Sequence, residues 1–303
     1  MNGFPTTAAA IGLTLCSAVS AGDGPTYELK YRFEAGTAFR YRETVSFETE
    51  ARSGDFVETN ATKSETVKSA VIASVDDAGV ATLTLTVEQA KLTPTANGQA
   101  LPRLDTASDE PVPFAYEAVA DAIGRPLAEI RVDAAGGYVD GRPLLGDDVL
   151  ETLAKGETGG DAVTRNFLIP LPDGPVAVGH RWEQRFKGRI SFDGANLKRE
   201  IDLRRRFELK AVDDGRATIA VRTTVLTPLR DPQALTQVAT REPRGEIVFD
   251  LDRGVMVSHR VWASGRVFDF AGPGSVFEAS SEQALTLLEV ADAASAAVAT
   301  TDE

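Results

Sequence analysis

Hydrophobic and polar residues alternate with a period of two along much of the chain. Tyr27, Leu29, Tyr31 and Phe33 are separated by charged residues, which is the pattern of a strand with one buried face and one wet face. The same alternation recurs in six later segments, at 39–47, 83–87, 201–209, 217–221, 247–251 and 255–261. Strands with one polar face are typical of antiparallel sheets. The pattern therefore predicts a mainly β protein that opens with an edge strand over 27–33.

Two similar segments predict hairpins at distant points of the chain. "SVDDAGVATLTL" begins at residue 74 and "AVDDGRATIAV" begins at residue 211. In each segment a turn of aspartate and glycine joins two alternating runs, and these residue types suit turn positions with positive φ. Each hairpin ends in Leu-Thr-Pro, at 92–94 and at 226–228. We therefore expect a hairpin tip at each of the two segments.

Two further pairs of similar segments occur in the same order as the hairpins. "GTAFRYR" from Gly36 matches "GHRWEQRF" from Gly179, and "IRVDAAGGYV" from residue 130 matches "IVFDLDRGVM" from residue 247. Four landmarks in one order predict an internal duplication. The first repeat is expected over 22–158 and the second over 159–291. Residues 292–303 lack large apolar side chains and are predicted to be a disordered tail.

Three short helices are expected between the strands. "AYEAVADAIG" at 115–124 predicts one in the first repeat, stopped by Gly124. "RDPQALTQVA" at 230–239 predicts its counterpart, with Asp231 as N-cap and Pro232 at the first helical position. A third is expected over 146–156, before a glycine-rich boundary at 156–160. The expected fold is therefore two related antiparallel curved sheets or partial barrels, each with an inserted short helix.

The first residues of the chain have the features of a signal peptide. The segment from Ala8 to Ala21 is uncharged and apolar, and it closes with small residues that a signal peptidase accepts. We expect cleavage after Ala21, a signal peptide over 1–21, and a periplasmic or extracellular protein without a transmembrane segment after cleavage. The single cysteine, Cys16, lies in this segment, so the mature chain would have no thiol. The alternatives are an apolar first strand or a mis-assigned start codon.

Charge and composition narrow the range of partners. The chain has 32 basic and 45 acidic residues, a formal net charge of -13 and a pI near 4.8. A net negative charge of this size repels nucleic acid and anionic lipid surfaces, so no nucleic-acid partner is expected. The hydrophobic fraction of 43% is that of a globular protein.

No segment carries a catalytic or cofactor signature. The two histidines, His180 and His259, are not accompanied by a serine motif or by the spacing of a zinc site. "DLDRG" at 250–254 lacks the ligand ladder of a calcium loop, and the aspartate pairs lie at predicted hairpin tips. We therefore expect no metal, no cofactor and no catalytic residue, while an exported hydrolase that uses carboxylates alone stays open.

One strand places a cation on its apolar face. Arg205 shares a face with Ile201, Leu203 and Phe207, and the aligned residue in the first repeat is Lys68. A buried cation is unfavourable without a partner, so two interpretations follow: an ion pair with a carboxylate, or a cation at a cavity mouth that meets an anionic headgroup. His259 alternates with valines and is expected to face the core. The candidate ligand-binding residues are Arg205, Lys68, His259, Trp182 and Trp262.

Three segments resemble a group of exported bacterial proteins of unknown function. They are "YELKYRFEAGTAFRYR", "IPLPDGPVAVGHRW" and "VLTPLRDPQALTQVATREPRGEIVFDLDRG". The resemblance covers most of 27–290, and it implies an exported β-rich protein but no activity. In architecture, the expected repeats are similar to the half-barrels of periplasmic lipoprotein and lipid carriers. This is a likeness of fold, which does not by itself imply function.

The sequence favours a non-enzymatic, exported binding module for an apolar or lipid-like ligand. The alternative is a protein of the cell envelope that binds another protein, or serves a structural role, and has no ligand cavity. The two hypotheses differ in the interior that they require. A carrier needs an apolar cavity of several hundred Å³, whereas a scaffold needs a core of ordinary packing density.

Overall fold

The computed structural model describes residues 24–145, 168–192 and 197–292. The predicted signal peptide at 1–21, the helix at 146–156, the domain boundary at 156–160 and the tail from 293 onward lie outside these residues. Residue 292, which we assigned to the tail, is the last residue of a strand. No helix in the described part of the chain is long and apolar enough to span a bilayer.

The described elements are mostly long strands. In chain order they are β1 (Thr26–Tyr27), β2 (Thr37–Ser53), β3 (Phe56–Val75), β4 (Ala81–Ala96), β5 (Gln99–Ala100), β6 (Leu104–Asp105), η1 (Phe114–Tyr116), α1 (Glu117–Ala120), β7 (Pro126–Val132), β8 (Tyr138–Pro143), β9 (Val176–Ala177), β10 (Arg181–Phe192), β11 (Leu197–Asp213), β12 (Arg216–Val225), α4 (Pro232–Thr236), β13 (Arg244–Asp250), β14 (Val255–Phe268) and β15 (Val276–Asp292).

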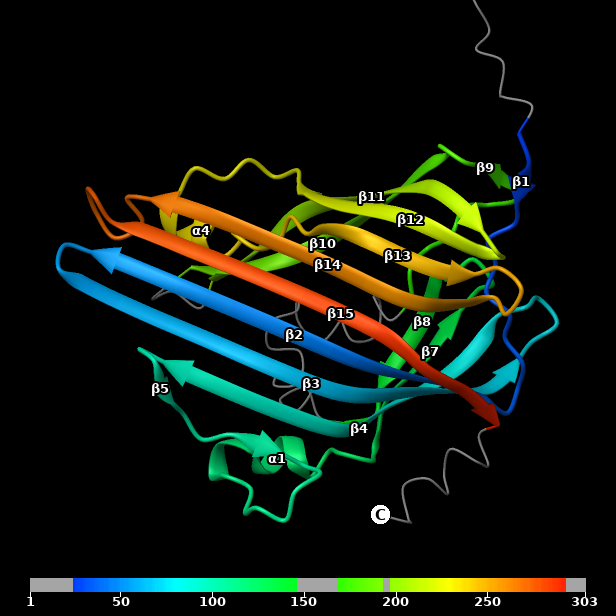
Figure 1. The fold of residues 1–303 in the computed structure, drawn as a ribbon, viewed down its shortest axis with the longest axis horizontal. Coiled ribbons are helices and arrows are strands. Elements are labelled where there is room, and N and C mark those ends of the chain that lie inside the picture. The colour runs from blue at the N-terminus through cyan, green and yellow to red at the C-terminus, as the bar shows by residue number, and fades with distance from the viewer. Residues whose placement is uncertain (1–23, 146–167, 193–196, 293–303) are drawn as a thin grey trace, which may run out of the picture.

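The prediction of a mainly β, antiparallel fold with short helices is confirmed. The strands of the two expected repeats do not form two separate sheets, however. Apart from β1 and β9, which pair as a small separate sheet, they lie in one sheet with the order β10-β11-β12-β13-β14-β15-β2-β3-β4-β7-β8, to which β5 and β6 add beside β4 (Figure 1). The sheet is continuous because the 17-residue strand β15 pairs with β14 on one side and with β2 on the other.

The predicted landmarks occupy equivalent places in the two halves of the sheet. The segments at 74 and 211 form the turns that join β3 to β4 and β11 to β12, and the segments at 130 and 247 form the hairpins β7–β8 and β13–β14. At the first turn, the Asp76 carboxylate accepts hydrogen bonds from the backbone of Ala78 and Val80. The hairpin interpretation is therefore confirmed, while the duplication stays a prediction.

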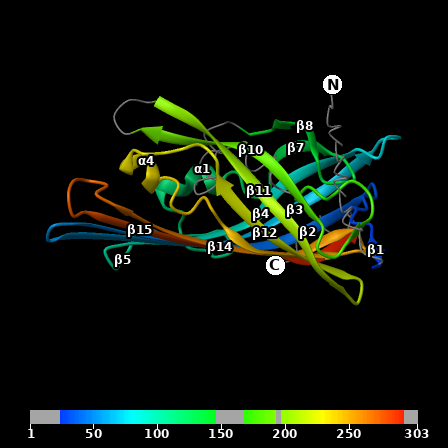
Figure 2. The ribbon, with the colours of Figure 1, turned by 90° about the horizontal axis from the view of Figure 1, so that it is seen from above.

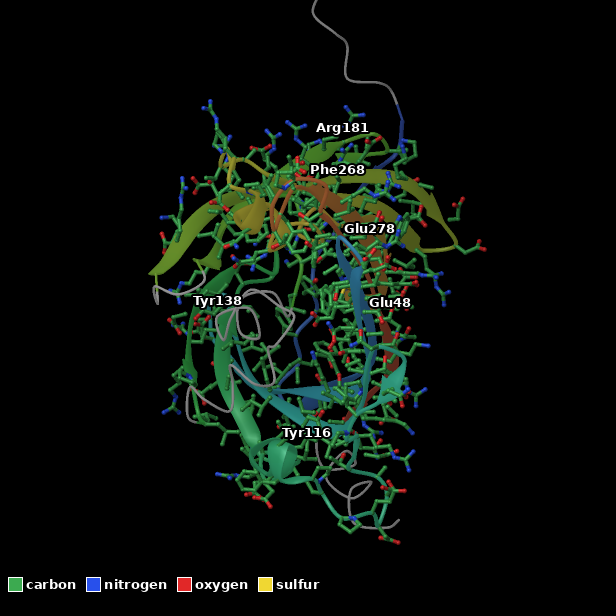
Figure 3. All side chains as sticks on the ribbon, turned by 90° about the vertical axis from the view of Figure 1, so that its left-hand side faces the viewer. Glu48, Tyr116, Tyr138, Arg181, Phe268 and Glu278 are labelled. Atoms are coloured by element: carbon green, nitrogen blue, oxygen red, sulfur yellow. The ribbon has the colours of Figure 1, made fainter. Side chains whose placement is uncertain are left out.

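The sheet is strongly curved, and the α-helices of the described residues, α1 and α4, lie on its concave side. Figure 2 shows α1 and α4 between the strands β10 and β11 and the layer of long strands, and Figure 3 shows the curvature end-on. The helix α1 packs with Val87 and Ala128, whereas α4 packs with Ile190, Ile201 and Leu203. Burial of apolar surface thus holds each helix against the half of the chain that contains it.

The largest hydrophobic cluster fills one end of the concave side and takes side chains from both halves. It includes Ile72 and Leu83 from one half and Phe207 and Phe249 from the other. Residues 28–33 cover this cluster, and their alternation is explained by burial of Leu29 and Tyr31. The prediction of an edge strand over 27–33 is wrong, since β1 ends at Tyr27 and pairs only with β9.

Candidate functional site

The ladder of strands is interrupted next to α4. The strand β13 begins at Arg244, which pairs with Arg222 of β12 and Trp262 of β14. Beyond this row β12 runs on to Val225 and β14 to Phe268 without a strand between them. The helix α4 and the turn that follows it occupy the space instead, because the chain returns to the sheet only at β13.

A groove of about 340 Å³ opens at this interruption. Most of the side chains that line it are aliphatic, and a glutamate and an arginine lie among them. The lining residues are Val225, Thr227, Leu229, Leu235, Val238, Ala239, Glu242, Ser264, Gly265, Arg266 and Val267. Leu229 and Leu235 are only partly buried. The groove therefore exposes apolar surface that a ligand could bury.

Local contacts fix the walls of the groove. Asp231 caps α4 by accepting a hydrogen bond from the backbone of Ala234 at 3.0 Å, as the sequence predicts. The Glu242 carboxylate accepts a hydrogen bond from the Val225 backbone at 2.8 Å and replaces a ladder bond that β13 does not supply. A Cβ atom on Gly265 would lie 2.4 Å from the Ala239 carbonyl oxygen. Glycine therefore lets β14 approach the turn closely.

A second groove, of about 360 Å³, differs in chemistry. It lies over β2, β3 and β4, and Lys63, Glu65, Lys91 and Glu282 are among its lining residues. Four charged side chains line it, against two, Glu242 and Arg266, in the groove beside α4. An apolar ligand would therefore approach fewer charges beside α4, which makes that groove the better candidate.

A buried polar cluster on the concave side contains the predicted residue Lys68. Its ammonium forms an ion pair with Glu43, which is 7% exposed. Gln283 donates a hydrogen bond to the same carboxylate at 2.6 Å, and Thr66 donates another at 3.4 Å. Burial acts to raise the pKa of Glu43, but the Lys68 charge and the three hydrogen bonds outweigh it and lower the pKa. Of the two interpretations given for a buried cation, the ion pair with a carboxylate therefore describes Lys68.

Arg205 and His259 lie near this cluster. Burial lowers the pKa of His259 to about 4, the positive charge of Arg205 adds to this effect, and the negative charge of Glu43 opposes it. The Arg205 guanidinium lies 5.0 Å from the centre of the Phe186 ring. His259 pairs with Ile247 and Leu285, both buried, so it faces the concave side as expected. The fold therefore brings Arg205, Lys68 and His259 into one neighbourhood.

We expect His259 to make the fold sensitive to mild acid. Because its folded-state pKa of about 4 lies below the ordinary value of 6.5, the unfolded chain binds more protons between these values. Acidification from pH 7 to 4.5 should therefore destabilise the native protein through this group by about 2 kcal/mol. In His259→Gln, the free energy of unfolding should fall by about 2 kcal/mol less over this pH range than in the native protein. Urea unfolding at both pH values measures the difference.

His180, the other of the chain's two histidines, supplies the control for this measurement, since it is exposed and directly precedes β10. His180→Gln should keep the pH dependence of the native protein. Equal pH dependence in His259→Gln and the native protein would contradict the burial of a neutral imidazole.

The two tryptophans lie on opposite faces of the sheet. Trp182 stacks on Phe207 with ring centres 5.3 Å apart, and its indole donates a hydrogen bond to the Pro170 carbonyl at 2.8 Å. Trp262 is 44% exposed and lies on the convex face, where the Arg244 guanidinium is 6.0 Å from its ring. Trp182 therefore contributes to the core, and Trp262 lies apart from Arg205, Lys68 and His259.

Comparisons with known proteins give no family and no function. No protein-family model matches the chain, and no curated protein matches it. A solved structure concerned with lipid–protein interactions in lipovitellin is similar with a TM-score of 0.45 and 14% sequence identity. The match covers 86% of this chain and 26% of that one, so this chain spans about a quarter of the lipovitellin chain. The resemblance to exported bacterial proteins of unknown function stays a prediction.

The sequence pattern did not reveal the residues that line the groove. Leu235 and Val238 belong to the segment 230–239 that we expected to form a helix, and Leu229 directly precedes it, so their apolar character is visible in the sequence. Their exposure arises because β13 begins only at Arg244 and leaves the end of β12 without a neighbouring strand. The sequence pattern does not show this. Within the described ranges, no three His, Cys, Asp or Glu side chains gather in a way that would hold a metal ion.

Proposed function

We propose that the protein is a non-enzymatic binding module that holds an apolar, lipid-like ligand in the groove beside α4. The observation that carries the proposal is the partly exposed aliphatic lining of that groove, at a point where the sheet has no strand to cover it. Its volume of about 340 Å³ falls in the range of small-molecule sites.

Physical chemistry supports an apolar ligand at this position. Apolar surface in contact with water is unfavourable, and a ligand that covers it gains about 25 cal/mol per Å². The hydrogen bond from Val225 to Glu242 already satisfies a backbone donor at the wall, so an apolar ligand would bury few polar groups without partners. The aliphatic side chains of the lining, which include Leu229, Leu235 and Val238, are therefore suited to contact with hydrocarbon.

The buried carboxylate does not favour the alternative of a carboxylate-based hydrolase. Glu43 is held by Lys68, Gln283 and Thr66, whereas acid catalysis by this route requires two carboxylates that face one substrate bond. We also propose that the module works after export to the periplasm or beyond, for which the composition of residues 1–21 is the support.

A neutral apolar fluorophore, N-phenyl-1-naphthylamine, tests the groove directly. We expect its emission to rise on titration with the native protein. Leu235→Gln should weaken binding about tenfold, because it replaces apolar lining by an amide and removes about 1.4 kcal/mol of contact. The matched control is Leu288→Gln on β15, where the leucine is 39% exposed and does not line the groove. It should bind as the native protein does.

Two outcomes would contradict the proposed function. One is the absence of any fluorophore binding by the native protein, and the other is equal weakening in both leucine variants. Native mass spectrometry of the protein from its own host gives an independent measurement. It should show a bound lipid on a chain whose mass corresponds to cleavage after Ala21.

A further inference from the structure

The convex face of β10 to β13 places arginines directly opposite one another. In the strand register Arg185 faces Arg204, and Arg206 faces Arg222, which in turn faces Arg244. We call these five residues the arginine patch. Residues in register on neighbouring strands have Cβ atoms about 5 Å apart, so their positive charges repel one another.

The carboxylates nearby do not balance this charge. Glu183 is shared, at 3.4 Å from Arg185, 3.7 Å from Arg206 and 3.9 Å from Arg204. In the described part of the chain, Arg222 and Arg244 have no carboxylate within 4.0 Å, and the buried Nε of Arg204 has no hydrogen-bond partner. Among the described residues, Glu183 is the only carboxylate paired with these five arginines, on a chain with a formal net charge of -13.

Other arginines on the same sheet face a carboxylate on the neighbouring strand. Arg266 faces Glu278, Arg142 faces Glu129, and Arg181 faces Glu208, each within an ion pair. Pairing of opposite charges across strands stabilises a sheet, and pairing of like charges destabilises it. The patch therefore departs from the pattern that these three arginines follow, which indicates that another anion neutralises it.

The patch borders the groove beside α4. The row from Arg206 through Arg222 and Arg244 ends at Trp262. On the face of the patch, the groove lining begins with Ser264, two residues beyond Trp262, whereas Val225, three residues beyond Arg222, lines the groove from the concave side. At 3.3 Å per residue, these steps are roughly 7 to 10 Å. A single amphipathic molecule can therefore reach both features.

We propose that the arginine patch binds the phosphate group of a ligand whose hydrocarbon chain lies in the groove beside α4. The inference rests on the proposed function for the hydrocarbon part and extends it to the headgroup. Guanidinium groups bind phosphate oxygens through paired, charge-assisted hydrogen bonds. A phosphate also supplies the negative charge that Arg222 and Arg244 lack within 4.0 Å among the described residues. A free phosphate ester has the same chemistry, and the experiment separates the two sources.

This assignment can be tested with three ligands that contain the hydrocarbon chain, the phosphate group, or both. Mono-oleoylglycerol has the chain without phosphate, oleoylglycerol 3-phosphate has both, and glycerol 3-phosphate has phosphate without the chain. Competition with N-phenyl-1-naphthylamine measures the two lipids, and the emission of Trp262 in a Trp182→Phe background measures glycerol 3-phosphate. The native protein should bind oleoylglycerol 3-phosphate at least about tenfold more tightly than mono-oleoylglycerol, and added salt should reduce this preference.

The paired variant Arg206→Gln/Arg222→Gln should bind the two lipids equally and keep the affinity of the native protein for mono-oleoylglycerol. Its unfolding midpoint should not fall, because the change removes two facing positive charges. Arg142→Gln on β8 is the control, since it removes one positive charge far from the groove and leaves Glu129 without its partner. The control should keep the preference for the phosphorylated lipid.

The outcomes separate the headgroup from the chain. Equal binding of both lipids by the native protein, or equal loss of the preference in the paired variant and the control, would overturn the phosphate site and leave the apolar groove intact. Binding of glycerol 3-phosphate that the paired variant abolishes, without binding of either lipid, would assign the patch to a free phosphate ester and overturn the proposed function. Preferential binding of duplex DNA to the patch would overturn both parts of the headgroup assignment.

Discussion

Gly245→Ala is expected to destabilise the protein by about 4 kcal/mol or more, which is a large part of the stability of a typical domain. A Cβ atom on Gly245 would lie 1.9 Å from the Arg260 carbonyl oxygen and 2.8 Å from the Val261 Cα. Both neighbours are backbone atoms of the adjoining strand β14, so no side-chain rotation relieves the overlap. The two strands would have to separate, with loss of ladder hydrogen bonds on both sides.

The position of β13 makes the expected effect large. This strand links β12 to β14 within the second half, so it connects β10, β11 and β12 to the rest of the sheet. Separation of β13 from β14 would also change the row of residues from which the groove beside α4 begins. Urea unfolding followed by far-ultraviolet circular dichroism measures the effect, and we expect a lower midpoint and less soluble protein.

Gly24→Ala is the matched control for this substitution. A Cβ atom on Gly24 meets nothing within 4 Å, so the change should leave stability within about 0.5 kcal/mol. A midpoint for Gly245→Ala equal to that of the control would show that β13 and β14 are not packed as closely as described.

Local chemistry explains the parts of the fold that the sequence predicts. The turn at Asp76 follows from a side chain that accepts two backbone hydrogen bonds within its own segment. The start of α4 follows from Asp231 and from Pro232 at the first helical position. The alternation in β2 and β11 identifies the buried face of each strand because the pleat alone sets it. These features depend on residues that are close in the sequence.

The pairing of strands depends on contacts that the period of two does not specify. Alternation tells which side of β15 is buried, but not that β2 and β14 flank it. For the same reason the pattern at 27–33 predicted a strand, although Leu29 and Tyr31 are buried without a ladder of their own. Trp262 differs in parity from His259 and Val261, so its place on the convex face is visible in the sequence once β14 is accepted.

The groove and the arginine patch arise from the register of distant segments. "RRR" at 204–206 is conspicuous in the sequence, but Arg185, Arg222 and Arg244 come beside it only through the pairing of four strands. The groove likewise requires that β12 continue to Val225, beyond Arg222, which is the last residue that β13 pairs with. Arg205 drew attention to a cation on the concave side, while its neighbours Arg204 and Arg206 lie on the opposite face and carry the larger unbalanced charge.

Lys68→Met is expected to destabilise the protein by about 3 to 5 kcal/mol at pH 7, because it leaves the buried Glu43 carboxylate without its cation. Glu43 is 7% exposed, so water does not replace the lost charge. The hydrogen bonds from Gln283 and Thr66 remain, but they do not neutralise a buried anion. Urea unfolding of Lys68→Met and of the native protein measures the difference.

The double variant Lys68→Met/Glu43→Gln separates the loss of the pair from the burial of a single charge. Removing both charges should restore most of the stability, since replacement of a buried ion pair by neutral groups is often neutral or stabilising. The cycle is completed by Glu43→Gln, which leaves Lys68 with its side chain 27% exposed and should cost less than Lys68→Met. Equal losses in all three variants would contradict a dominant role of charge and indicate a packing defect.

The pH dependence gives a second test of the same pair. In the native protein the lowered pKa of Glu43 contributes stability that is present above the ordinary carboxyl pKa and is lost as the pH falls below it. In Lys68→Met, burial without the cation should raise the pKa of Glu43 instead, so that protonation neutralises the buried group. Acidification from pH 7 to 5 should therefore narrow the stability gap between Lys68→Met and the native protein. A gap that stays constant over this range would mean that the carboxylate reaches water in the variant, which contradicts its burial on the concave side.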